Sequence, residues 1–107
     1  MRVESTGKLP QYQVIGKKLR IHWDEQEVTR ETDEGVETLF SYEEACVPVQ
    51  ASRSTVIEAI MATKYPTPGA EFAALQNGPE TVAEHQAMRE LAKELAAGVN
   101  HGSLRIR

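Results

Sequence analysis

Two histidines and their neighbours are the side chains of this chain best suited to chemistry. In His22-Trp23-Asp24 an imidazole and a carboxylate stand two residues apart, so both would project from one face of a strand. This pair could begin a metal site, but two ligands without a third form neither a structural nor a catalytic zinc site. We therefore expect the polar face of a half-buried strand. His85 falls, with Val82, on the inward apolar stripe of the last expected helix, which favours a core-edge histidine bonded to backbone over a ligand or proton-transfer role.

The other polar residues carry no catalytic signature. Carboxylates occur in runs such as Asp24-Glu25 and Glu43-Glu44, in turns or on exposed faces, whereas acid–base catalysis needs two carboxylates in different environments. No serine stands in a nucleophile-elbow motif, and no glycine-rich phosphate loop is present. We expect no enzymatic activity, no metal and no cofactor.

Aromatic side chains are the second candidate signal. Glutamates surround them, whereas RNA-binding sheets display their aromatics among basic residues. Core packing is expected for Tyr12 and Trp23. For Phe40 and Tyr42 two roles stay open: packing under a helix of this chain, or contact with another chain, since exposed aromatics often dominate interfaces. With Val28, these two form the candidate partner-binding group.

A long β-hairpin is expected to position these side chains. The stretches Lys18–Arg30 and Val36–Val49 flank Thr32-Asp33-Glu34-Gly35, which fits a type I turn followed by a left-handed glycine bulge. That register pairs Trp23 with Ala45 and Val28 with Phe40. The apolar residues then change from odd to even numbers midway along the hairpin. A second apolar face therefore needs a cover, from this chain or from a partner.

The remaining pattern predicts an α+β fold: an N-terminal three-stranded antiparallel β-meander packed against two or three C-terminal α-helices. Gly16-Lys17 suits a two-residue turn that adds a strand before Lys18, and after Gln50 the apolar period becomes helical. Residues 1–8 are expected to be flexible, 9–97 to form one domain, and 98–107 to form a tail. The expected elements are strands at Pro10–Ile15, Lys18–Arg30 and Val36–Val47, and helices from Ser52 or Ser54 to about Lys64, at Ala70–Gln76, and from Pro79 to about Ala97.

The helical half carries a resemblance. Its features are a capped amphipathic segment, a tyrosine-ended turn and two later motifs: Ser52-Arg53-Ser54-Thr55-Val56-Ile57-Glu58-Ala59-Ile60, Tyr65, Glu71-Phe72-Ala73-Ala74-Leu75 with Asn77, and Met88-Arg89-Glu90-Leu91-Ala92-Lys93. This pattern, mainly over residues 52–95, resembles small prophage and mobile-element proteins of gut Bacteroidales-like bacteria. The resemblance implies a phage structural or tail-associated component without catalysis. This chain departs from it in the last helix, where His85 and Met88 stand in place of an aromatic residue.

Composition adds limits on the class of protein. The chain has 107 residues and a formal net charge of −4, so there is room for one domain and no basic surface for nucleic acid. The single cysteine, Cys46, is expected to be buried and fits a reducing compartment. No signal peptide or membrane-spanning run is present, so the cytoplasm is expected, with incorporation into a phage particle open.

Together these features predict a non-enzymatic structural or assembly protein of phage or prophage type that acts through protein–protein contacts. Its partner would be another protein or a second copy of the chain, with no nucleic acid and no membrane. The alternative is a small-molecule or metal-binding module that uses a cleft between sheet and helices. That cleft would be lined by His22, Trp23, Asp24 and His85.

Overall fold

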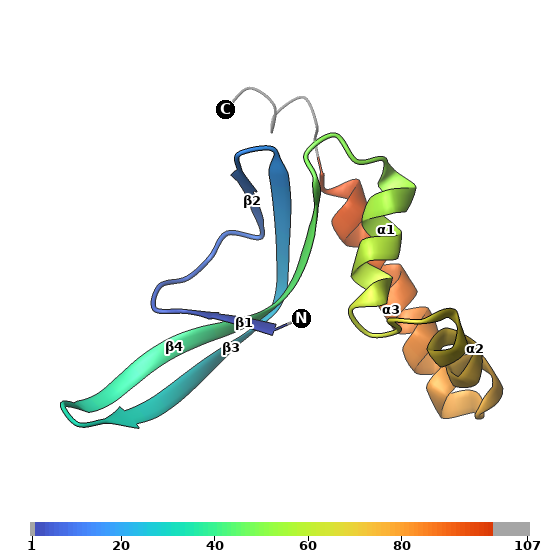
Figure 1. Ribbon diagram of the computed structural model, residues 1–107. Helices are drawn as coiled ribbons and strands as arrows, with labels where there is room; N and C mark the ends of the chain where they lie inside the picture. The colour runs from blue at the N-terminus through green and yellow to red at the C-terminus, as the bar shows by residue number, and fades with distance from the viewer. Residues whose placement is uncertain (1, 100–107) are drawn as a thin grey trace.

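The computed structural model describes residues 2–99 and has an α+β fold (Figure 1). One antiparallel sheet has the strand order β1-β4-β3-β2, and three helices follow it in the chain. The elements are β1 (Arg2–Ser5), β2 (Tyr12–Ile15), β3 (Lys18–Thr32), β4 (Gly35–Pro48), α1 (Arg53–Ala62), α2 (Pro68–Gln76) and α3 (Pro79–Ala97). The expected meander corresponds to β2, β3 and β4. No described helix is long and apolar enough to cross a bilayer.

A fourth strand, β1, corrects the expectation that residues 1–8 lack regular structure. This strand pairs with β4, and Arg2 anchors it there. Arg2 Nη1 donates to Asp24 Oδ2 at 2.9 Å and to Glu43 Oε2 at 3.0 Å. The Nε of Arg2 donates to Ser41 Oγ at 2.7 Å. Polar pairing across strands, rather than an apolar alternation visible in the sequence, therefore holds this edge of the sheet.

The register of the hairpin also differs from the expected one. Trp23 pairs with Glu43 rather than with Ala45, and Val28 pairs with Leu39 rather than with Phe40. At the tip the cause is the turn. Gly35 has the expected positive φ of 126°, but Thr32 pairs with Gly35 itself, so only Asp33-Glu34 lies in the loop.

A β-bulge at Asp24-Glu25 is the second cause of the shift. These two residues of β3 lie opposite one residue of β4, and Asp24 has a φ of 56°. An inserted residue reverses the relation between residue number and face, so Val28 stays on the face of Trp23. The strand β4 has no bulge, and Phe40 and Tyr42 therefore lie on the opposite face from Trp23. The expected change of apolar face is present along β4, but Val28 does not take part in it.

The main core lies between the sheet face of Trp23 and the helix pair α1–α3. Residues of β3, β4, α1 and α3, together with Ala51 just before α1, form one buried cluster: Leu19, Ile21, Ala45, Val47, Ala51, Val56, Ile60, Met61, Ala92, Leu95 and Ala96. Tyr12, Trp23, Ile57 and Leu91 pack against its edge. This confirms the expected packing of the helical stripes on the sheet. Two expectations fail: Val82 is 37% exposed, and Cys46 is exposed.

The helix ends follow the capping residues. Ser52 caps α1, its side chain accepting from the N–H of Thr55, and Thr67 does the same for α2. This extends α2 back to Pro68, and α1 ends at Ala62, earlier than expected. The helix α3 ends at Ala97, as expected, and Gly98 is its C-cap.

Tyr12 ties the sheet to the end of α3. Its hydroxyl donates to the carbonyl of Leu95 at 2.8 Å, and a Cβ at Gly98 would collide with that hydroxyl. Burial raises the pKa of Tyr12.

The molecule is far from spherical, because the β3–β4 hairpin runs away from the helices (Figure 1). Its radius of gyration is 16.0 Å, with extents of 49 × 38 × 19 Å. A compact chain of this length would have a radius of gyration of about 13 Å. We call the projecting part of the hairpin, residues 25–39, the arm.

Candidate functional site

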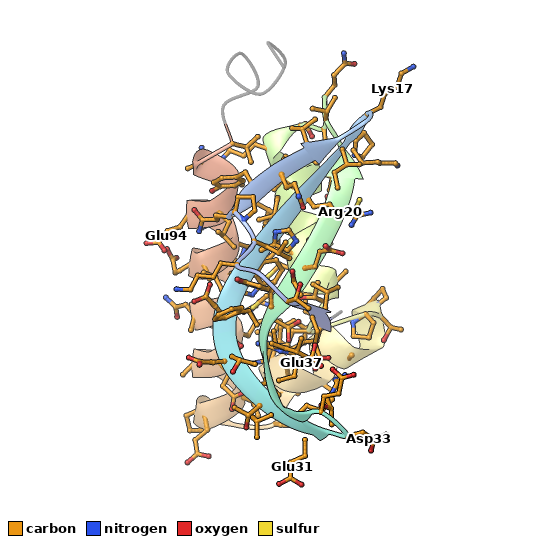
Figure 2. The ribbon with its side chains drawn as sticks, turned by 90° about the vertical axis from the view of Figure 1, so that its left-hand side faces the viewer. Lys17, Arg20, Glu31, Asp33, Glu37 and Glu94 are labelled. Carbon is orange, nitrogen blue, oxygen red and sulfur yellow. The ribbon has the colours of Figure 1, made fainter. Side chains whose placement is uncertain are left out.

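The arm carries the net negative charge of the chain. Residues 25–39 include six acidic side chains and one basic side chain, Arg30, which gives −5, so the other residues sum to +1. Glu31 and Asp33 lie at its far end and point outward (Figure 2). Val36, next to the turn, is 71% exposed. Most of the arm is in contact with solvent on both faces, unlike the sheet near the helices.

The second apolar face of the sheet is covered by this chain. Tyr42 is 3% exposed, and its hydroxyl accepts from the N–H of Leu9 at 2.9 Å and donates to Glu25 Oε1 at 2.8 Å. The ammonium group of Lys8 lies 5.7 Å from the ring centre of Phe40. The cover is thus the segment that joins β1 to β2, residues 6–11. Of the two sources left open, this chain supplies the cover, but with an irregular segment and not with the helix expected over Phe40 and Tyr42.

The environment of Tyr42 favours its neutral form. Burial raises its pKa above the ordinary 10.0, and the hydrogen bond to Glu25 acts in the same direction. An acid whose pKa is higher in the folded state is stabilised only while it stays protonated. Its contribution to stability is therefore complete below pH 10.0 and declines as the pH rises further.

His22 joins the same N-terminal segment to the sheet. The residue is 2% exposed; its Nδ1 lies 2.8 Å from the carbonyl oxygen of Pro10 and its Nε2 lies 2.9 Å from Glu44 Oε2. Its ring centre is 5.7 Å from that of Tyr42, on the face opposite the helices. His22 therefore lies away from the cleft that it was expected to line.

His85 connects two helices. Its Nε2 lies 2.6 Å from Glu71 Oε2 of α2, and its ring centre is 5.2 Å from that of Tyr65. The histidine is 8% exposed, as expected for the edge of a core, but its partner is a carboxylate and not the backbone. Neither histidine lines the cleft between sheet and helices.

A cleft of about 580 Å³ does lie between the sheet and the helices. It is lined by Trp23, Asp24, Glu43, Thr63, Lys64, Met88 and Leu91, and so includes two of the four residues expected there. Its charged groups have partners: Asp24 and Glu43 bind Arg2, and Lys64 Nζ lies 3.3 Å from Glu84. Among residues 2–99 no group of three or more histidine, cysteine, aspartate or glutamate side chains could hold a metal ion.

Sequence reasoning missed the carboxylate partners of both histidines. Only a register that has both the two-residue turn and the bulge at Asp24-Glu25 places Glu44 across from His22, as the structure does. Glu71 could not be predicted as the partner of His85 in this way, because the sequence does not determine the geometry of the loop that joins α2 to α3. The far part of the hairpin was expected to need a cover from this chain or from a partner, and in the structure most of residues 25–39 are exposed.

Comparison with known proteins adds no relative. No protein-family model matches the chain, and no curated protein or solved structure is significantly similar to it.

Proposed function

We propose that this chain is a small non-enzymatic structural or assembly protein of the phage or prophage type, which acts by binding other proteins through its arm. The arm itself supports this most directly. A two-stranded hairpin exposed to water on both faces is at best marginally stable alone. The projecting residues therefore add little to the stability of the fold, and their exposed surface is free to bind another protein. The resemblance over residues 52–95 supports the phage setting.

The buried polar groups are consistent with this class. His22 pairs with Glu44, and His85 pairs with Glu71. Each pair joins two segments of the chain, and in each the histidine side chain is buried by the chain itself, with 1% of His22 and 10% of His85 exposed. These groups thus have structural roles that require no substrate.

Shortening the arm tests the proposal. Replacing residues 29–38 with Asn-Gly joins the paired residues Val28 and Leu39 through a two-residue turn and leaves the core untouched. The chain would be co-expressed with the products of its neighbouring genes, and complexes would be measured by light scattering after purification. We expect a defined complex, with a tail, portal or baseplate protein or with a second copy, that the shortened chain no longer forms.

Glu94→Lys provides the matched control, because Glu94 is an exposed residue of α3 far from the arm (Figure 2). It should leave the complex intact. Thermal unfolding of both variants should stay cooperative. A wild-type chain that remains monomeric and binds no neighbouring product would contradict the proposal.

The second candidate function is binding of a small molecule in the cleft. Its volume of about 580 Å³ lies within the usual range of ligand sites, and Trp23, Met88 and Leu91 give it an apolar wall. A screen of metabolites and divalent metals by thermal shift tests it. A ligand at 100 times its Kd should stabilise the fold by about 2.7 kcal/mol and change the fluorescence of Trp23. If no compound raises the Tm, this candidate is rejected.

A further inference from the structure

We infer that the free edge of β3 in the arm accepts an extended basic segment of another protein as an added strand. This inference rests on the proposed function, since it names how the arm would bind and what chemistry its partner would have.

An added strand would lie along the edge of β3 that faces away from β4. The strand β2 pairs only with Lys18–Ile21 of β3, and the N–H of His22 donates to the carbonyl of Gln11 at 2.8 Å. Beyond the bulge, β4 is the only strand that pairs with β3 in residues 2–99. The edge of β3 from Gln26 to Thr32 therefore has no neighbouring strand in the part of the chain that the structure describes.

The backbone N–H and C=O groups of successive residues of β3 point alternately toward β4 and toward this edge. Thr32 and Gly35 flank a two-residue turn and so form a hydrogen-bonded pair across the hairpin. Hydrogen-bonded pairs alternate along an antiparallel ladder. Glu27, Thr29 and Glu31 consequently direct their N–H and C=O groups away from β4, and all three residues are exposed. Such a row of outward groups is the template on which a peptide adds as a strand.

The charges along this edge determine the charge of the partner. If a second copy paired along the same edge with Thr29 opposite Thr29, Glu27 of each copy would face Glu31 of the other. Like charges directly opposite are destabilising, and the arm as a whole carries −5. A segment with lysine or arginine at positions four apart would instead place a cation opposite each glutamate. The edge thus selects a basic segment over a second copy of itself.

A designed peptide tests the inference. The capped peptide Thr-Lys-Glu-Thr-Val-Lys-Thr, aligned antiparallel to residues 26–32, places its lysines opposite Glu31 and Glu27 and its glutamate opposite Arg30. At millimolar peptide we expect the amide signals of Glu27, Thr29 and Glu31 to shift and their hydrogen exchange to slow severalfold. The amides of α3 should not change. The same peptide with both lysines replaced by glutamate should not bind.

Variants of the chain distinguish the contribution of backbone hydrogen bonds to peptide binding from the contribution of side-chain charge. Thr29→Pro removes one outward N–H without removing a donor from the β3–β4 ladder, and it should abolish the slowing of exchange. E27K/E31K converts two attractive pairs into repulsive ones and should weaken binding about tenfold. E34K/E37K changes the net charge equally at the turn and on β4, and it should weaken binding much less. If Thr29→Pro disturbs the arm, the two charge variants still decide the outcome.

The inference is overturned if exchange at the three edge residues does not slow, or if E34K/E37K weakens binding as much as E27K/E31K. Its failure is distinct from failure of the proposed function. Should the arm-shortened chain lose its protein partner while Thr29→Pro still binds that partner normally, the arm binds proteins but not by strand addition. If shortening the arm changes no complex, the proposed function fails whatever the peptide does.

Discussion

Ile60→Ala is expected to lower the free energy of unfolding by about 2–5 kcal/mol. Ile60 is fully buried, on the face of α1 that packs in the core cluster with Leu19, Ile21 and Leu95. Truncation removes three carbon atoms from contact with the sheet and with α3 and leaves a cavity that the surroundings fill only in part. A domain of this kind has about 5–15 kcal/mol of stability in total, so the loss is a large part of it. Urea unfolding followed by the fluorescence of Trp23 measures the effect.

Leu75→Ala is the matched control, because leucine and isoleucine contain the same atoms and both residues lie in helices. Leu75 is 43% exposed, and α2 has no buried residue at all. Its truncation should cost less than about 1 kcal/mol. Equal losses at the two positions would show that the core does not lie between α1, α3 and the sheet.

The helices and the main core could be predicted from the sequence because each helix has its own local signals. Ser52 accepts a hydrogen bond at the start of α1, Pro79 begins α3, and Gly98 ends it. The spacing of Ile60 and Leu95 places each on the buried side of its helix. These features depend on residues within about one helical turn in the sequence, so they can be recognised without knowing the tertiary structure.

The strands were harder to predict because register depends on single residues far apart. One residue fewer in the turn and one residue more at Asp24-Glu25 together moved Trp23 from Ala45 to Glu43. The strand β1 depends on Arg2, whose partners are 22 to 41 residues away. Val82 was expected to be buried from its place on the helical stripe, but the sheet does not extend to that end of α3 (Figure 1).

The two faces of the sheet are stabilised in different ways. On one face, apolar side chains of α1 and α3 cover Leu19 and Ile21. On the other, a segment without regular structure covers Tyr42, and it is held by hydrogen bonds to Tyr42 and His22. Hydrogen bonds of this kind contribute little when satisfied but are costly when one partner is removed. The second face should therefore be sensitive to the loss of a single polar group.

His22→Phe is accordingly expected to cost about 3 kcal/mol, although phenylalanine keeps a ring of similar size. The change leaves the carbonyl of Pro10 and the carboxylate of Glu44 without the imidazole nitrogens that now lie 2.8 and 2.9 Å away. Arg20, with Nη1 4.0 Å from Glu44, compensates only in part. The amide of Leu9 should exchange faster, because it belongs to the segment that the imidazole holds.

A double-mutant cycle with Glu44→Leu separates the interaction energy between His22 and Glu44 from the energetic cost of burying each side chain. Glu44→Leu alone leaves a buried imidazole nitrogen unpaired, whereas in the double variant both members of the pair are apolar. The double variant should therefore be more stable than the sum of the two single losses predicts, by about 1–3 kcal/mol. Effects that add within about 0.5 kcal/mol would show that His22 and Glu44 do not stabilise one another. In that case packing alone would hold the segment from Thr6 to Gln11 over Tyr42, and removal of the Glu44 carboxylate would not destabilise that segment.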